Sequence, residues 1–562
     1  MLTAMIKIWC KNTNNILKIE EGSTLFDIFV KINRENDGAM PFAPICAKVN
    51  NRISSLDYKV FSTKEIEFLD LTSPSGQRTY LRTLIFILTK AVNDLFPEKK
   101  VTVCNAVSNG FFCYIKDDKK DRTPLIDQDI ERIKSRVSEI IAADMKIKQH
   151  AMRTEKAIKI FKEQDMDSKV KLLNFTGRMF STVYEIDGYY NYFYGSVLPR
   201  TSMVTLYAID KSYDGLLLRI PSRKNPAELP PIIKDIKLHE TFYESRLWQE
   251  IIGIQTIGDF NTAVEEGLST DVIIVSEALQ EKKIAKIAET IAAQKDTKIV
   301  LIAGPSSSGK TSTCKRVSIQ LLTCGKKPLQ ISLDDYFVDR ERTPLQPNGD
   351  YDYESIYALN LELFNRNLNE LLEGKAVRLP RYNFIKGASE MSDTILQMNE
   401  DNVLVIEGLH ALNPMLTQQI DDKHIFRLYA SALTSISLDE HNYIPTSDNR
   451  LLRRIIRDAR TRGCDARETI RRWPSVREGE DKWIFPYQDN ADAVLNTAML
   501  FELAVIKNHV EPVLERVPEN CPEYSEAYRL LKFLKYIPKV PEMDIPGTSL
   551  LREFLGGSSF NY

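Results

Sequence analysis

Short alternating runs of apolar and polar residues open the chain and predict a small unit rich in strands. Alternation over four to eight residues is the pattern of a half-buried strand. It occurs at residues 6–9, 16–19, 45–49 and 66–71. Between the second and third of these runs, residues 23–33 place four large apolar side chains on one helical face. We therefore expect a β-rich domain with one helix over residues 1–72.

The pattern then changes to longer periodic segments, which are typical of a mixed α+β region. A helix is predicted over residues 127–149, because isoleucine and valine recur there every three or four positions. Three prolines follow residue 225 and indicate a linker. A second amphipathic helix is predicted over residues 277–293. We assign residues 73–225 to an α+β domain and residues 226–294 to a linker with helices.

From residue 295 onward, strand-like and helix-like segments alternate. This alternation is typical of a parallel sheet that is covered by helices on both faces. The fully apolar run at residues 299–303 predicts a buried central strand. We assign residues 295–517 to an α/β domain. Residues 518–562 are expected to form a C-terminal helix, at 524–536, and a tail.

Composition shows an ordinary globular protein that is too long for one domain. Its 562 residues are 43% hydrophobic and 27% charged, and 75 basic residues nearly balance 77 acidic ones. Bulk charge therefore favours neither nucleic acid nor a membrane surface as a partner. The eight cysteines form no CxxC pair and the six histidines form no HxxxH pair, which suits a reducing compartment. With no apolar run near 18 residues, we expect a cytoplasmic protein.

The strongest chemical signal follows the apolar run, where residues 304–312 read GPSSSGKTS. This is the phosphate-binding loop pattern. Its glycines let backbone N–H groups converge on an anion, and the next helix adds the positive end of its dipole. Lys310 is expected to reach the β- and γ-phosphates of ATP, and Thr311 to bind Mg²⁺. The predicted ATP-binding residues are Gly304, Ser306, Ser307, Ser308, Gly309, Lys310, Thr311 and Ser312.

This loop sharpens the predicted fold class. We expect an α/β protein with a P-loop NTPase parallel sheet and helices on both faces. A small β-rich domain and an α+β domain precede it along the chain.

Three further segments place charged residues where phosphoryl transfer needs them. Asp334 and Asp335 follow a short predicted strand, where open α/β sheets bind ligands, and a carboxylate there can accept a hydroxyl proton. Glu407 ends the apolar strand of NVLVIEGLH and is a candidate Mg²⁺ ligand. Nine arginines lie between residues 450 and 472, which favours a lid that closes on phosphates. Each segment has an alternative interpretation. The aspartates would cap a turn, Glu407 would end a buried strand, and the arginines would lie on a helix that is solvated or binds RNA.

Together these motifs resemble the uridine–cytidine kinase branch of the phosphoribulokinase/uridine kinase family. The resemblance covers residues 296 to 515 and rests on GPSSSGKTS, SLDDYF, DYDYES, VRLPRYNF, VLVIEGLH and RLLRRIIRDARTRG in the family's order. It implies that Asp334 is the general base for a nucleoside 5′-hydroxyl and that Asp352 binds the ribose. It also implies two nucleoside-pocket aromatics, one arginine near the acceptor and two lid arginines on the transferred phosphate: Phe337, Tyr382, Arg454, Arg457 and Arg462.

Three positions depart from the pattern of the pyrimidine-specific members. Gly387 stands where those members carry a histidine that faces the base, and Arg472 stands at a base-contacting glutamine position. Cys464 replaces one lid arginine. Losing a hydrogen-bonding group from a buried pocket can change selectivity by orders of magnitude. We therefore leave the base of the nucleoside open.

The N-terminal half resembles two domains of threonyl-tRNA synthetases. Residues 5–71 resemble the TGS domain through ICAKVNNRISSLDYKVFSTKEIEFLD, and this resemblance implies a small β-grasp domain. Residues 77–222 resemble the editing domain through VNDLFPEKKV and VSNGFFCYI. The positions of that family's catalytic histidines and cysteine are held by Arg82, Phe86, Phe193 and Val197. Because the groups that would bind a metal or activate water are missing, we expect this half to serve packing, oligomerisation or ligand sensing.

The sequence thus predicts an ATP-dependent, Mg²⁺-requiring kinase that acts on a nucleoside 5′-hydroxyl and releases ADP. Catalysis is assigned to Asp334, Lys310, Arg457 and Arg462, and the Mg²⁺ ligands are Thr311 and Glu407. The alternatives are a tRNA- or nucleotide-sensing regulator that uses ATP as a switch, and a residual aminoacyl-ester hydrolase. The expected partners are a small nucleoside acceptor and further copies of the chain, while RNA is not favoured. The tail after residue 550 either docks or folds over the nucleotide site as a lid.

Overall fold

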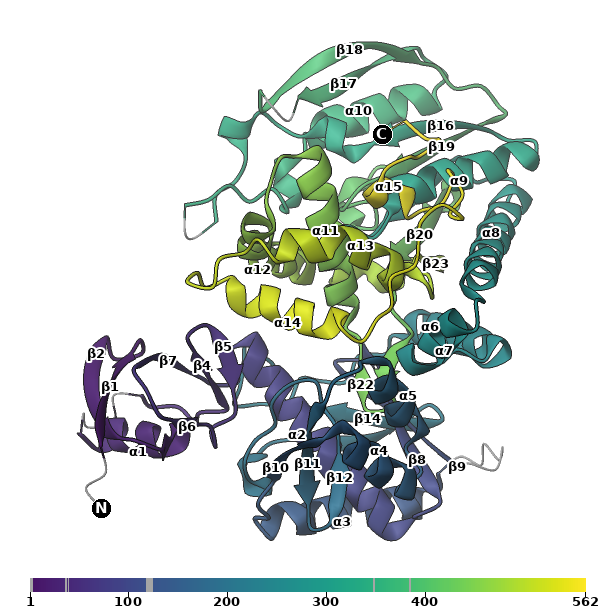
Figure 1. Cartoon of the computed structure of the whole chain (residues 1–562). Coiled ribbons are helices and arrows are strands. Elements are labelled where there is room, and N and C mark those ends of the chain that lie inside the picture. The colour runs from purple at the N-terminus through teal and green to yellow at the C-terminus, as the bar shows by residue number, and fades with distance from the viewer. Residues whose placement is uncertain are drawn as a thin grey trace.

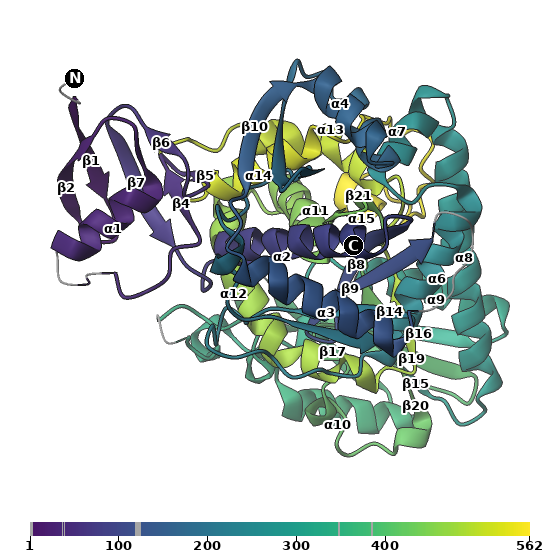
Figure 2. The same ribbon diagram turned by 90° about the horizontal axis from the view of Figure 1, so that it is seen from below.

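The computed structural model describes residues 4–35, 38, 40–117, 125–346, 349–383 and 386–561. Three units follow one another along the chain, and in Figure 1 the first lies to one side, the second below and the phosphate-loop region above. Figure 2, seen from below, shows helix α2 (Pro74–Leu95) running across the second unit. Across these described ranges, no helix is long and apolar enough to cross a membrane.

The first unit is a five-stranded mixed sheet with one helix packed on it. The strand order is β2-β1-β7-β4-β5, in which β1 and β7 are parallel and the other pairs are antiparallel. Helix α1 (Leu25–Glu35) buries its apolar face against the sheet. The strands are β1 (Met5–Cys10), β2 (Asn15–Glu20), β4 (Cys46–Val49), β5 (Arg52–Ser54) and β7 (Lys64–Leu69), with a small pair formed by β3 (Ser23–Thr24) and β6 (Lys59–Val60). The four expected strands coincide with β1, β2, β4 and β7.

The second unit combines two antiparallel sheets with helices. The sheet orders are β13-β14-β9-β8 and β10-β11-β12. The strands are β8 (Lys99–Val107), β9 (Gly110–Asp117), β10 (Lys148–Arg153), β11 (Phe180–Ile186), β12 (Tyr189–Asn191), β13 (Ala208–Ser212) and β14 (Gly215–Arg219). The helices that accompany α2 are α3 (Asp127–Ala142), α4 (Thr154–Glu163) and α5 (Asp167–Phe175).

The helix expected over residues 127–149 is shorter than predicted. Helix α3 ends at Ala142, and Asp144 adopts a positive φ of 46°, which cannot continue a helix. The following residues instead form β10, which pairs with β11 along six positions. Long-range strand pairing therefore overrides the local helical pattern at this point.

Five parallel strands form the sheet of the phosphate-loop region, in the order β16-β19-β15-β20-β23. They are β15 (Ile299–Ala303), β16 (Lys327–Ser332), β19 (Asn402–Glu407), β20 (Ile425–Ser431) and β23 (Ala493–Asn496). Val300 and Ile302 of β15 pack with α8 (Ser269–Ala293) and α9 (Lys310–Thr323), whereas Ile299 and Leu301 pack on the opposite side with α10 (Leu361–Leu372). This confirms the predicted α/β class with helices on both faces.

Other elements surround this sheet. Helices α6 (Ile236–Ile252) and α7 (Ile257–Glu265) precede α8, which begins earlier than the predicted residue 277. Strands β17 (Val377–Asn383) and β18 (Ala388–Leu396) form a hairpin near α10. Towards the C-terminus lie α11 (Thr446–Thr461), α12 (Ala466–Trp483), α13 (Glu502–Leu514), α14 (Tyr524–Leu534) and the short α15 (Arg552–Leu555).

A second hairpin, β21 (Ser437–Asp439) and β22 (Asn442–Tyr443), ties the phosphate-loop region to the second unit. Asp439 forms a fully buried ion pair with Lys169 of α5, with Nζ and Oδ1 2.6 Å apart. The amide of Asn442 donates to the Tyr192 carbonyl at 3.0 Å, and the backbone N–H of Val103 donates to the carbonyl of residue 440 at 2.7 Å. Helix α11 starts three residues after this hairpin, so one loop both anchors the second unit and leads into the arginine-rich helix.

Candidate active site

The phosphate loop lies where β15 ends and α9 begins. Gly304 must be glycine, because a Cβ there would collide with the Ala430 carbonyl oxygen. Ser307 and Gly309 have positive φ values of 58° and 85°, which curl the loop. Lys310 opens α9 and donates its ammonium to the Pro305 carbonyl at 3.2 Å. This is the loop-to-helix arrangement that binds phosphate.

Two buried arginine–glutamate pairs brace the loop. Arg450 pairs with Glu480 at 2.5 and 2.7 Å, and Glu480 also accepts the backbone N–H of Ser306 at 2.9 Å. Arg453 pairs with Glu502 at 2.8 Å, and neither side chain is exposed. Two arginines of the predicted lid are therefore structural supports, because their charges are neutralised inside the protein.

Three other arginines gather around Asp458 on the last turns of α11. Arg454, Arg457 and Arg462 approach its carboxylate at 3.3, 3.0 and 3.7 Å. Arg454 also donates to the Ser306 hydroxyl at 2.6 Å, which connects this cluster to the phosphate loop. Burial lowers the pKa of Arg454 and of Arg462. The structure thus brings together the three arginines that the sequence assigns to the acceptor and the transferred phosphate.

The side chain of Glu407, the last residue of β19, lies against the phosphate loop. The Oε1 atom of Glu407 accepts hydrogen bonds from the Thr311 hydroxyl at 3.3 Å and from the Ser332 hydroxyl at 3.0 Å. Asp334 follows at once, and its backbone N–H donates to Ser332 Oγ at 3.3 Å. Burial, reinforced by the charge of Asp334 and opposed by Lys310, raises the pKa of Glu407 from 4.5 to about 7. The predicted base, metal carboxylate and phosphate lysine therefore share one electrostatic environment.

These residues fit a Mg²⁺ ion that is held mainly by substrate. No group of three carboxylate, histidine or cysteine side chains that could bind a metal occurs among the residues that the structure describes. Mg²⁺ usually takes one or two protein oxygens and completes its shell with phosphates and water. The hydroxyl of Thr311 and the carboxylate of Glu407, 3.3 Å apart, provide such a pair.

A second buried carboxyl, that of Glu354, was not singled out by the sequence motif. Its Cβ packs so closely on Gly479 of α12 that any larger residue at 479 would collide with it. Burial, with a contribution from Glu480, raises the pKa of Glu354 from 4.5 to about 7, while Arg454 and Lys310 oppose the shift. Its Oε2 is buried without a hydrogen-bond partner in the described part of the chain. No signal in the sequence distinguishes Glu354 from the neighbouring acidic residues.

The predicted acceptor residues lie on the segments after β16 and in the β17–β18 hairpin. The rings of Phe337 and Tyr382 lie 5.6 Å apart at 55°. Asp352 is half-buried, and no described residue hydrogen-bonds its carboxylate. Gly387 lies against Arg340, since a Cβ at 387 would stand 2.7 Å from the guanidinium carbon. Arg340 therefore takes the space beside the position where the family's histidine is missing.

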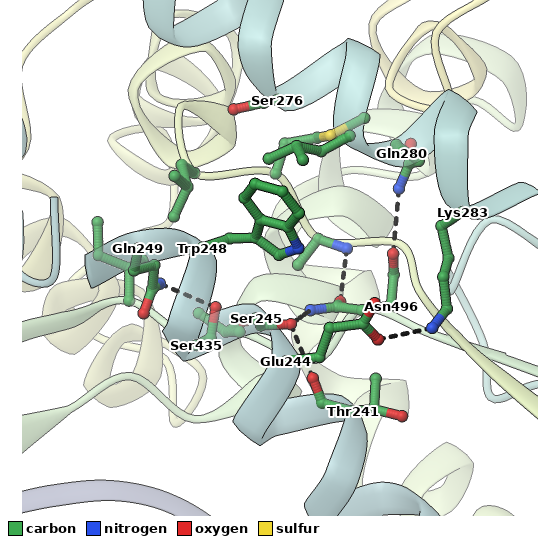
Figure 3. A pocket seen from close by; sticks show the side chains of 16 residues that line it. Thr241, Glu244, Ser245, Trp248, Gln249, Ser276, Gln280, Lys283, Ser435 and Asn496 are labelled. Atoms are coloured by element: carbon green, nitrogen blue, oxygen red, sulfur yellow. Dashed lines mark hydrogen bonds and ion pairs between the residues drawn. The ribbon is translucent and has the colours of Figure 1, made fainter. Parts of the chain in front are cut away.

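A cavity of about 120 Å³ lies near the loop, between α6, α8 and the segments that follow β20 and β23 (Figure 3). Trp248 and Met499 contribute to its lining. Its polar side chains pair with one another: Lys283 with Glu244, Asn496 with Ser245, and Gln249 with Ser435. Since these groups satisfy one another, the cavity adds no residue to the candidate site.

The four positions that an editing hydrolase would use are filled in the second unit. Phe86 and Phe193 are buried, and their rings meet edge to face at 5.8 Å. The Arg82 guanidinium lies over the Tyr194 ring at 4.7 Å, and Val197 is buried. These side chains are packed ones, and none of the four is a metal ligand or a proton acceptor.

Comparisons with known proteins agree with a kinase-type C-terminal region. Residues 299–502 match the Phosphoribulokinase / Uridine kinase family. A uridine kinase of Staphylococcus aureus is 28% identical over 203 residues, which are 36% of this chain and 88% of the relative. A structure of D-glycerate 3-kinase from Cryptococcus neoformans covers 38% of this chain and 89% of that chain, with 14% identity and a TM-score of 0.28. The C-terminal region is thus similar to this kinase family over residues 299–502.

The N-terminal region has a different relative. A threonine–tRNA ligase of Pelobacter propionicus is 26% identical over 192 residues, which are 34% of this chain. The match spans only 29% of the length of that relative. The chain therefore joins a region similar to a synthetase to a region similar to the kinase family, and the TGS resemblance of the first unit stays a prediction.

Proposed function

We propose that this chain is a nucleoside kinase that transfers the γ-phosphoryl group of ATP to the 5′-hydroxyl of a nucleoside. The contact of Glu407 with both Thr311 and Ser332 carries the proposal, because it joins the phosphate loop to the strand that delivers Asp334. A nucleotide switch needs the loop and a metal carboxylate. Transfer to an acceptor hydroxyl also needs a group that takes the proton, and we assign this role to Asp334.

In this reaction the loop N–H groups and Lys310 hold the β- and γ-phosphates of ATP. Asp334 accepts the proton of the 5′-hydroxyl. The oxygen of that hydroxyl bonds to the γ-phosphorus, and the bond between the γ-phosphorus and the ADP oxygen breaks. Arg457 and Arg462, held by Asp458, stabilise the negative charge on the transferred group. Mg²⁺, held by Thr311 with Glu407 beside it, would neutralise charge on the phosphate oxygens. The products are a nucleoside monophosphate and ADP.

The acceptor is held by residues outside the phosphate loop. The paired rings of Phe337 and Tyr382 offer an aromatic surface for a nucleobase, and Asp352 supplies acceptor oxygens for the ribose hydroxyls. Arg340 supplies hydrogen-bond donors where pyrimidine-specific members have a histidine, so the choice of base is expected to differ from theirs.

The test is ADP release with ATP and Mg²⁺ across a panel of nucleosides: uridine, cytidine, adenosine, guanosine, inosine and their deoxy forms. At least about tenfold stimulation by one nucleoside is expected, with the stimulation lost in Asp334→Asn. Stimulation by glycerate or a sugar instead would replace the nucleoside with another hydroxyl acceptor. Slow hydrolysis that no acceptor stimulates, together with tRNA binding, would favour a nucleotide-dependent switch.

A further inference from the structure

The C-terminal tail packs against the phosphate loop. Residues 547–559 close into a loop of their own, because the backbone N–H of Ser559 donates to the Gly547 carbonyl at 2.8 Å. Leu550, Leu551 and Phe554 are fully buried. Figure 1 shows α15 beside α9, the helix that starts at the phosphate loop. The tail therefore belongs to the surroundings of the nucleotide site.

Glu553 of α15 places its carboxylate on the first turn of α9. Its Oε2 atom accepts a hydrogen bond from the Ser312 hydroxyl at 2.6 Å and lies 3.4 Å from the backbone N of the same residue, which also donates to it. Ser312 is one of the residues that the loop motif assigns to the phosphates of ATP. A carboxylate at a helix N-terminus has the same sign of charge as a phosphate and uses the same donors.

Helix α11 holds the tail in this position. Arg460 donates to the carbonyl oxygens of Glu553 at 2.7 Å and of Phe554 at 3.2 Å. The guanidinium of Arg453, which braces the phosphate loop, lies 5.0 Å from the Phe554 ring centre. Leu550 reaches to 3.8 Å from the point where a Cβ of Gly309 would be. The tail is thus held by contacts with both the phosphate loop and the arginine-rich helix.

We propose that Glu553 is an intramolecular competitor of ATP and that the tail forms an autoinhibitory contact. The proposal rests on the proposed function, because it requires ATP as the ligand of the loop. The N–H and hydroxyl of Ser312 cannot donate to Glu553 and to a phosphate at once, and the two anions repel each other. ATP binding therefore selects the form in which the Glu553 side chain has left. If about one-tenth of the molecules are in that form, the apparent Kd for ATP rises about tenfold.

Calorimetry of Mg²⁺–ATP binding to the full chain, without an acceptor, tests this directly. Glu553→Gln keeps the size of the side chain and removes its charge, and an apparent Kd about tenfold lower than that of the unaltered chain is expected. Arg460→Ala loosens the tail from the other side and should lower the Kd in the same direction. Glu519→Gln is the matched control. Glu519 lies in the same C-terminal segment but pairs with Arg52 of β5 at 2.9 Å, so its loss should leave the Kd unchanged.

The outcomes separate the tail proposal from the proposed function. If the unaltered chain binds ATP and Glu553→Gln binds it equally or more weakly, Glu553 is not a competitor and the tail proposal is wrong. If neither protein binds ATP, the proposed function fails together with the tail proposal. Should Glu553→Gln melt at a much lower temperature, Arg460→Ala decides, since it leaves the carboxylate of residue 553 unaltered.

Discussion

The phosphate-loop domain and the second unit both bring distant side chains to one point, with opposite results. In the phosphate-loop domain, Thr311, Ser332 and Glu407 meet through hydrogen bonds, and the buried carboxyl keeps a raised pKa. In the second unit, the corresponding meeting point is filled by the rings of Phe86 and Phe193. One region therefore keeps polar groups in contact with one another, and the other packs aromatic rings together.

The difference shows that a fold and the chemistry of a site on that fold are separate properties. A buried carboxyl costs stability unless its charge is compensated, so it is expected to persist only where it has a use. Burial raises the pKa values of Glu354 and Glu407, and the charge of Lys310 offsets part of this cost. In the second unit, by contrast, Phe86, Phe193 and Val197 are buried apolar side chains, and the Arg82 guanidinium lies over the Tyr194 ring.

Breaking the link between the two regions should have the largest effect. Lys169→Met leaves Asp439 buried without its partner, and we expect the free energy of unfolding to fall by about 3–5 kcal/mol. Urea unfolding measures this loss. Lys171→Met is the matched control, because Lys171 is half-exposed in its ion pair with Asp259 and should cost less than about 1 kcal/mol. Equal losses in the two variants would show that the buried pair does not hold the regions together.

Removing the chemistry of the phosphate-loop domain should come next. Lys310→Ala removes the phosphate-binding cation and Asp334→Asn removes the proton acceptor, and each should lower kcat more than about a hundredfold. Melting temperatures should change little, because neither side chain forms part of a core. Lys327→Ala is the control, since Lys327 pairs at the surface with Asp401 and should keep full activity. Retained activity in Asp334→Asn would remove Asp334 as the base.

The cost of the buried carboxyls should appear as a pH dependence. Glu354 has a folded-state pKa of about 7, above its ordinary value of 4.5, so its contribution to stability is present at pH 4.5 and is lost as the pH rises through 7. Between pH 5 and 7 the unaltered chain should lose about 2 kcal/mol more than Glu354→Gln, at roughly 1.4 kcal/mol per pKa unit. Denaturant titrations at several pH values measure the difference. Glu362→Gln, at an exposed site on α10, should follow the unaltered chain.

The smallest effect is expected in the second unit. Arg82→Ala loses the stacking of a guanidinium on Tyr194, which should lower stability by about 1 kcal/mol and leave kcat within about twofold. Parallel melting and ADP-release measurements check both values. A large loss of activity would show that the second unit contributes to the reaction, and would remove the contrast between the two regions.

Local patterns predicted much of this molecule. The apolar run of β15 and the loop after it identified the parallel sheet and the positions of Lys310 and Thr311, because these depend on neighbouring residues. The predicted end of α3, at residue 149, was wrong. The positive φ of Asp144 and the pairing of β10 with β11 depend on distant segments. The sequence did not identify Glu354 for the same reason. Glu354 packs closely on Gly479, which lies far along the chain. The supporting roles of Arg450 and Arg453 likewise depend on glutamates of other helices.

The β21–β22 hairpin places a buried ion pair across the boundary between the two halves. Domains joined by a linker can usually be cut apart and studied alone. Here a separated C-terminal region would leave Asp439 without Lys169 and Asn442 without the Tyr192 carbonyl. The two halves are therefore expected to unfold as one cooperative unit, since separating them would expose charged groups that satisfy each other in the full chain.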